Sequence, residues 1–239
     1  MHLVLLPGLD GTGELFQSFL KVLPSSLTAQ VVSYPTEQYL TYKELVLLVQ
    51  NVLPHKEPFV LLGESFSGPL SIEIAALHPE NLRAVILCAS FISNPLPPSL
   101  TWVAWFPRPL ISLIGNLSSP DIFVKFFAAG MDSPQDLLDL FRRVKRKVSP
   151  RVIAERVRAV QEVDAREALK KCSIPILYLM AKQDRLVSLK CFDDIRNIKP
   201  NIEVVEVNAP HFILQRSPQE ASVAIDRFIE ALSGNESIL

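Results

Sequence analysis

Cysteine is scarce in this sequence, and neither sign of charge dominates. The three cysteines, Cys88, Cys172 and Cys191, are odd in number and widely separated, which excludes a disulfide framework and the close spacing of a metal site. A reducing, cytoplasmic location is therefore expected. The 24 lysines and arginines against 25 aspartates and glutamates leave a net charge of −1, so no basic surface for nucleic acid is expected. Nothing in the composition implies a cofactor.

Long uninterrupted hydrophobic runs are also missing. The apolar run after Met1 is short and lacks the charged start of a signal peptide, so no such leader is expected. The longest run, residues 102–117, is interrupted by Pro107, Arg108 and Pro109, so no transmembrane segment is predicted. Hydrophobic residues still make up 49% of the 239 residues, which predicts one sizeable core and an apolar pocket or face.

Short apolar runs alternate with helical patterns through most of the chain. Continuous apolar runs are typical of strands buried on both faces, and their alternation with helices indicates the α/β class. We therefore predict a mostly parallel sheet of about six strands with helices on both faces. The predicted strands cover residues 3–6, 29–33, 59–62, 83–89, 174–180 and 202–207.

The alternation stops between residues 94 and 162, where no strand pattern appears. Prolines are frequent in the first part of this segment, and helical spacing of apolar residues follows. The segment is therefore predicted to be a helical cap inserted into the α/β core. The aromatic cluster of Trp102, Trp105 and Phe106 is expected either to pack inside the cap or to contact a substrate. The discontinuous core is predicted to comprise residues 1–93 and 163–239.

The most informative stretch is Pro58–Gly68, in which a buried strand runs directly into a turn and then a helix. A serine at the apex of such a turn is typical of the nucleophile elbow, which exposes the hydroxyl on a strained backbone. This pattern predicts that Ser65 is a nucleophile. The usual motif is G-x-S-x-G, whereas Ser67 stands here at the last position and glycine follows it. Glu64 is expected to face solvent or to bond locally.

An acid and a histidine follow two later strands. In open α/β sheets the active crevice lies at the carboxyl ends of the strands, which directs attention to the loops after residues 6, 63, 181 and 207. These last two loops contain Asp184 and His211. A serine hydroxyl needs a base that is poised near neutral pH, and an acid fixes the tautomer of that base. We therefore predict a Ser65, His211 and Asp184 triad.

The first loop supplies a candidate oxyanion hole. Residues 7–13 are rich in glycine, which lets the backbone approach a ligand closely. The backbone amides of Leu9 and Phe66 are predicted to face the developing oxyanion. Asp164 is a rival acid, but it precedes its strand and is expected to make a turn or cap. The basic run 142–147 is predicted to be the solvated face of a cap helix, with a membrane-surface or anionic-substrate role as the alternative.

The chain resembles small bacterial α/β-hydrolases of the carboxylesterase and lipase type. Residues 6–13 resemble the oxyanion loop of that family, with Pro7 where a histidine is common, and residues 63–68 resemble its elbow. Residues 163–187 and 211–220 resemble the stretches that carry its acid and its histidine. The resemblance covers about residues 1–93 and 163–232, and it implies an α/β-hydrolase fold with a variable cap.

Together these observations predict a serine carboxylic ester hydrolase that acts on small to medium hydrophobic esters through an acyl-enzyme. Two alternatives stay open. An acyltransferase would pass the same acyl group to an alcohol, and a non-catalytic binding protein would keep only the scaffold. The expected partner is a small ester, and the oligomeric state is not predicted.

Overall fold

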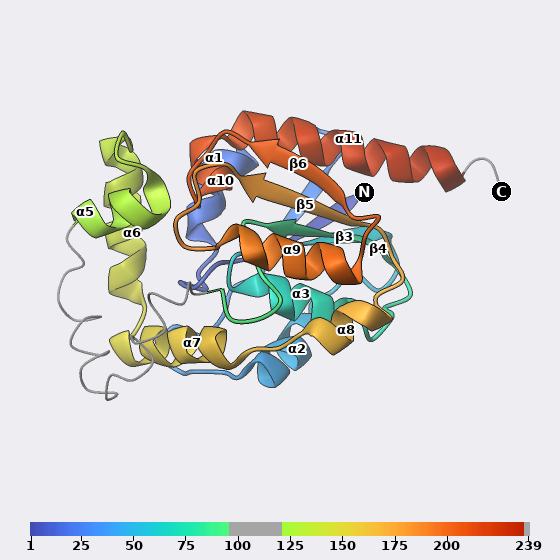
Figure 1. Cartoon of the computed structure of the whole chain (residues 1–239), viewed down its shortest axis with the longest axis horizontal. Coiled ribbons are helices and arrows are strands. Elements are labelled where there is room, and N and C mark those ends of the chain that lie inside the picture. The colour runs from blue at the N-terminus through green and yellow to red at the C-terminus, as the bar shows by residue number, and fades with distance from the viewer. Residues whose placement is uncertain (96–120, 237–239) are drawn as a thin grey trace.

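A computed structural model of the chain describes residues 1–95 and 121–236. Within these residues one sheet has six strands in the order β2-β1-β3-β4-β5-β6, and every neighbouring pair is parallel (Figure 1). The predicted fold class is confirmed, and each predicted strand is found within two residues of its expected ends. The strands are β1 (His2–Leu6), β2 (Thr28–Val31), β3 (Phe59–Glu64), β4 (Leu82–Cys88), β5 (Ile176–Ala181) and β6 (Glu203–Val207).

The strands differ in burial according to their place in the sheet. All six residues of β3 are buried, because helices cover both of its faces and strands flank both of its edges. The two edge strands, β2 and β6, consist mostly of partly exposed and exposed residues. A continuous apolar run therefore marks the centre of this sheet, where the elbow strand lies.

Helices pack on both faces of the sheet. One face is covered by α2 (Tyr42–Gln50), α3 (Ser67–Ala75), α8 (Arg166–Lys171) and α9 (Leu189–Ile198). The other face is covered by the 3-10 helix η1 (Glu14–Phe16) and by α1 (Gln17–Leu20), α10 (Ile213–Arg216) and α11 (Pro218–Glu236). The side chains of alternating strand residues enter the two apolar clusters in turn, as the pleat of a strand requires.

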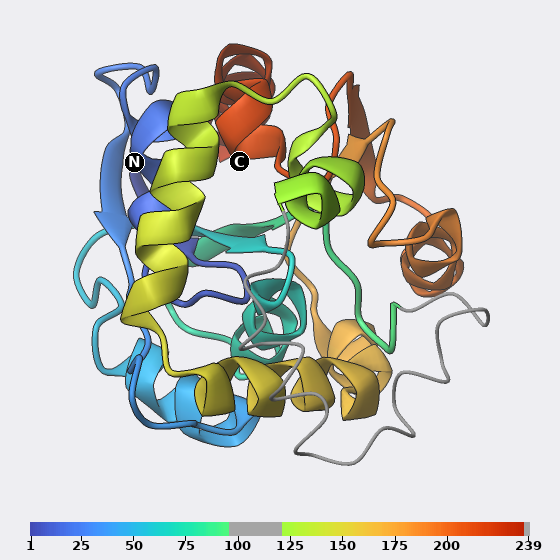
Figure 2. The same cartoon turned by 90° about the vertical axis from the view of Figure 1, so that its left-hand side faces the viewer.

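Four helical segments follow in residues 121–162. They are α5 (Asp121–Val124), the π-helix η3 (Lys125–Ala129), α6 (Gln135–Lys147) and α7 (Pro150–Glu162). In Figures 1 and 2, α5 and α6 lie beyond the carboxyl ends of the strands, and α7 meets α6 at an angle. An isolated antiparallel bridge joins Ser93 to Asp164, close to where the chain leaves and re-enters the sheet region.

Two of the sequence-based expectations cannot be read from these elements. The division into a core and a cap stays a prediction, and Trp102, Trp105 and Phe106 lie outside the described residues. Among the helices that are described, none is long and apolar enough to cross a membrane.

Candidate active site

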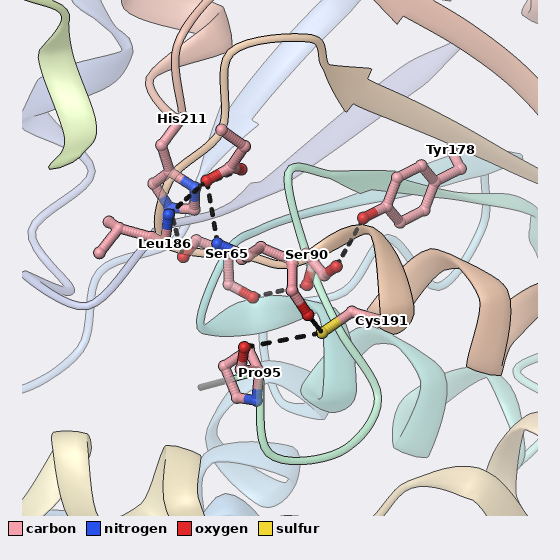
Figure 3. Close-up of polar contacts among 10 residues, drawn as sticks. Ser65, Ser90, Pro95, Tyr178, Leu186, Cys191 and His211 are labelled. Carbon is pink, nitrogen blue, oxygen red and sulfur yellow. Dashed lines mark hydrogen bonds and ion pairs between the residues drawn. The ribbon is translucent and has the colours of Figure 1, made fainter. Parts of the chain in front are cut away.

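The turn between β3 and α3 has the backbone of a nucleophile elbow. Ser65 lies at its apex with φ of 49°, in the left-handed region that serine rarely adopts. The turn is held because the Ser65 amide donates to the Cys88 carbonyl (2.9 Å) and the Ser90 hydroxyl donates to the Ser65 carbonyl (2.6 Å; Figure 3). Glycine is required at position 68, because a Cβ there would collide with the Ser90 side chain.

The structure brings the three predicted triad residues together from the loops after β3, β5 and β6. The Ser65 Oγ lies 2.8 Å from His211 Nε2, and the two side chains face each other in Figure 3. On the other side of the ring, His211 Nδ1 lies 2.8 Å from Asp184 Oδ2. The remaining carboxylate oxygen, Oδ1, accepts from the amides of Leu186 (2.8 Å) and Val187 (2.9 Å), which fixes the acid in place.

Burial and charge act in opposite directions on His211, whose side chain is almost fully enclosed. Burial by itself would lower the pKa of the imidazole, because it disfavours the cation. The Asp184 carboxylate outweighs this effect through its charge and its hydrogen bond, and Glu64 adds to it, so that the pKa of His211 is raised above 6.5. A histidine in this state is a stronger base than a free one, and its cation has a partner.

The glycine-rich loop lies directly beside the elbow. A Cβ added at Gly8 would be 4.0 Å from the Ser65 Cβ, so the next amide, that of Leu9, is close to the nucleophile. The second candidate donor, the Phe66 amide, immediately follows Ser65 in the chain. Neither amide donates a hydrogen bond to any other residue that the structure describes. Both therefore have the unused donor that an oxyanion hole requires.

The expectation for Glu64 is wrong. Its side chain is only 5% exposed, and its Oε1 accepts from Gln215 Nε2 at 2.9 Å, a partner 151 residues away. Its pKa is raised to about 7, mainly because burial disfavours the charged form, and the Asp10 charge adds to this effect. The hydrogen bonds from Gln215 and the Gly8 amide and the His211 charge act in the opposite direction but are outweighed. The end of β3 has no exposed side, because α10 and the glycine-rich loop both pack on it. A second titratable carboxyl therefore lies beside the triad.

This burial makes a prediction about stability. The folded pKa of Glu64 lies above the value of 4.5 for a free side chain, so its favourable contribution is present at low pH and is lost as the pH rises through about 7. The shift corresponds to roughly 3 kcal/mol. Glu64→Gln should therefore raise Tm relative to the wild type at pH 8.5 by several degrees more than at pH 5.5. The control is Glu80→Gln, at an exposed position, and a pH-independent difference would contradict the expectation.

The other titratable groups that the sequence pointed to lie apart from the triad. Asp164 is half-exposed and accepts from the Arg166 amide at 3.1 Å and from its guanidinium at 2.5 Å, which is the predicted turn. In the basic run, Arg142 pairs with Asp121 and Lys147 pairs with Glu14 at 2.6 Å, on a largely solvated helix face. No cluster of possible metal ligands occurs in the described parts of the chain.

One buried cation near the site was not predicted from the sequence. The Arg156 side chain of α7 is 1% exposed, and its guanidinium donates to the carbonyls of Leu9 (3.0 Å), Asp10 (2.7 Å) and Pro35 (2.9 Å). Its helix is amphipathic and contains three other arginines or glutamates on exposed positions, so the pattern alone did not distinguish this residue. The glycines of the loop were the one indication in the sequence that another group packs closely against this backbone. A Cβ at Gly11 would collide with the Arg156 guanidinium.

The fold and the position of this site at the strand ends define an α/β-hydrolase. The family model described as serine aminopeptidase, S33 matches residues 40–195, well over half of the chain, and the chain belongs to this family. The matched region contains Ser65 and Asp184 but ends before His211. The predicted membership of the α/β-hydrolases, and the prediction of an enzyme, are confirmed.

Three similar proteins illustrate this relationship. The chain is 26% identical over 213 residues to the pimeloyl-[acyl-carrier protein] methyl ester esterase of Vibrio vulnificus, covering 84% of this chain and 83% of that protein. It is 25% identical over 246 residues to the biotin biosynthesis bifunctional protein BioHC of Cellvibrio japonicus, covering 95% of this chain but spanning only 45% of that relative. The crystal structure of a lipase-esterase related protein from Clostridium acetobutylicum has the same fold, with a TM-score of 0.78, 16% identity and coverage of 95% and 93%.

Proposed function

We propose that this chain is a serine ester hydrolase that acts on small to medium hydrophobic esters. The observation that carries the proposal is the unbroken hydrogen-bonded path from Asp184 through His211 to Ser65. Binding alone does not require all three residues in this geometry, which argues against a non-catalytic role. The similarity to a methyl ester esterase supports an ester as the substrate class.

The mechanism follows from this geometry. Ser65 Oγ attacks the acyl carbonyl while His211 Nε2 takes its proton, and Asp184 stabilises the imidazolium that forms. The carbonyl oxygen becomes an oxyanion that accepts from the Leu9 and Phe66 amides, each donor contributing about 3 kcal/mol to the transition state. The imidazolium then protonates the leaving alkoxide oxygen as the C–O bond breaks, and the alcohol departs. Water activated by His211 hydrolyses the acyl-enzyme and restores Ser65.

Contacts around the histidine support an apolar acyl or alcohol group. The Phe212 amide donates to the Ala128 carbonyl at 3.0 Å, and its ring lies 6.1 Å from the ring of Phe141 on α6. Helices from residues 121–162 thus bring apolar side chains against Phe212, the chain neighbour of His211. A hydrophobic wall at this position favours substrates whose leaving group or acyl chain is itself apolar.

A fluorophosphonate probe tests this proposal. The probe should add one phosphonyl group to the wild type, which mass spectrometry of the digested protein should place on Ser65, and prior labelling should abolish hydrolysis of p-nitrophenyl esters. A series of such esters with increasing acyl length should show which chain length is preferred. Failure to label Ser65 would contradict the proposal.

The same assay separates the neighbouring activities. Aminoacyl p-nitroanilides should be poor substrates, and faster turnover of anilides than of esters would instead favour the peptidase chemistry in the family's description. Methanol offered beside water tests the acyltransferase alternative. Predominant formation of methyl esters at low methanol concentration would favour transfer over hydrolysis.

A further inference from the structure

The loop formed by residues 7–13, which we call the oxyanion loop, is anchored to the elbow through Ser67. The Ser67 hydroxyl is completely buried and donates to the Pro7 carbonyl. Tyr34 Oη lies 2.7 Å from Ser67 Oγ, and since the Ser67 hydrogen is directed to a carbonyl, the tyrosine hydroxyl is the donor of this second bond. The serine that replaces the usual glycine of the motif therefore connects the elbow to the oxyanion loop.

The other anchor of the oxyanion loop is Arg156. Its Nη1 donates to the carbonyls of Leu9 and Asp10, while its Nη2 donates to Pro35. A buried arginine is costly unless its donors are satisfied, and no carboxylate of the described residues lies within ion-pair distance of this one. Arg156 also lies near the Tyr34 ring, at 5.7 Å from its centroid, so Tyr34 links the two anchors.

These anchors act on the two peptide groups that flank the Leu9 amide. The Leu9 N–H belongs to the peptide between Gly8 and Leu9. The preceding carbonyl, that of Pro7, is held by Ser67, and the following carbonyl, that of Leu9, is held by Arg156. The carbonyl of the Gly8–Leu9 peptide itself accepts from the Gly11 amide at 3.0 Å, so this peptide and both of its neighbours are held by hydrogen bonds.

We propose that Arg156 and Ser67 are positioning residues that hold the Leu9 amide toward the acyl carbonyl of a substrate. The inference rests on the proposed function, because the direction of this amide matters only when an oxyanion forms at Ser65. Arg156 contributes through charge-assisted bonds to two successive carbonyls, which are stronger than neutral ones. Misplacing one oxyanion donor lowers the rate by about 10² or more.

The test compares Arg156→Ala and Arg156→Lys with Arg158→Ala. Arg158 lies two residues further along α7, is about half-exposed and pairs with Glu162 at 2.8 Å, so it is a matched control. All rates are expressed per active site, after titration to completion with the fluorophosphonate. Arg156→Ala should lower kcat/KM for p-nitrophenyl butyrate by about 10²-fold, Arg156→Lys by less, and Arg158→Ala not at all. Millimolar guanidinium should partly restore Arg156→Ala.

A second measurement separates positioning from folding. An alkylboronic acid binds as a tetrahedral adduct on Ser65, so its Ki should rise in Arg156→Ala by a factor similar to the loss of kcat/KM. A purely structural defect would reduce the number of titratable sites and leave Ki per site unchanged. Ser67→Gly restores the usual motif but removes the bond to Pro7, and it should lower kcat/KM per active site about tenfold. This variant tests the inference even if Arg156→Ala does not fold.

The outcomes distinguish this inference from the proposed function. Wild-type kcat/KM and boronate Ki per site in Ser67→Gly and in a folded Arg156 variant would overturn the positioning role. If Ser65→Ala is inactive in the same experiment, the proposed function stands while the inference fails. If Ser65→Ala stays active, the proposed function itself is wrong.

Discussion

Replacing Ser65 with alanine should lower kcat for ester hydrolysis by about 10⁶. In the proposed mechanism this substitution removes the atom that carries the acyl group. The 2.8 Å contact with His211 Nε2 places the native hydroxyl where it can lose its proton. Some rate above the uncatalysed reaction should persist, because the oxyanion donors and the binding surface remain. Hydrolysis of p-nitrophenyl esters, corrected for the spontaneous reaction, gives the comparison directly.

The control for this variant is Ser222→Ala. Ser222 is also buried, and its hydroxyl donates to the Val22 carbonyl at 3.0 Å, on the sheet face that carries α1 and α11. Its loss should cost about 1 kcal/mol of stability and leave kcat unchanged. Near-normal esterase activity in Ser65→Ala, in a preparation free of contaminating enzyme, would remove Ser65 from the mechanism.

The second large effect is expected for Asp184→Asn, at about 10⁴ in kcat. The carboxylate accepts from His211 Nδ1 at 2.8 Å, whereas the amide of an asparagine can donate to this nitrogen. The ring would then carry its proton on Nε2 and could no longer accept one from Ser65. Because Asp184 also raises the pKa of His211, the residual activity should persist to lower pH than that of the wild type.

The direction of this pH effect follows from the proposed role of His211 as a base. In the wild type, the rate should fall as the pH drops through a value above 6.5, since protonated imidazole cannot accept the serine proton. Asp164→Asn is the matched control, because this half-exposed carboxylate pairs with Arg166 and should alter neither kcat nor the pH profile. Equal losses of kcat in Asp184→Asn and Asp164→Asn would show that Asp184 is not the acid of the triad.

Much of this architecture could be predicted because the signal lies in short runs of sequence. The buried strands are continuous apolar segments, and a parallel sheet places all their carboxyl ends at one edge, so residues far apart in the chain could be assigned to one site. The helices α8 and α10 were not predicted, because six and four residues are too few to show a helical period. Their ends depend on tertiary contacts rather than on local pattern.

The interactions that were missed are those whose partners are distant in sequence. Glu64 was expected to face solvent or to bond locally, because nothing next to it in the chain shows that Gln215 will lie against it. Ser67 looked like a small departure from a motif, yet its hydroxyl bonds to a loop 60 residues earlier. A single side chain that bonds to a residue distant in sequence produces no repeating pattern, so such contacts are found only in the folded structure.

The position of Arg156 on α7 restricts which segments of this protein can be exchanged with those of a relative. The arginine comes from α7, a helix within the predicted insertion, yet its donors end on the backbone of a loop 146 residues earlier. An exchange of the whole predicted insertion with that of a relative would leave these three carbonyls without their present donor. If Arg156 positions the Leu9 amide as proposed, grafts that keep α7 and replace only the segments before it should preserve turnover. For engineering purposes α7 should then be kept together with the proposed catalytic residues.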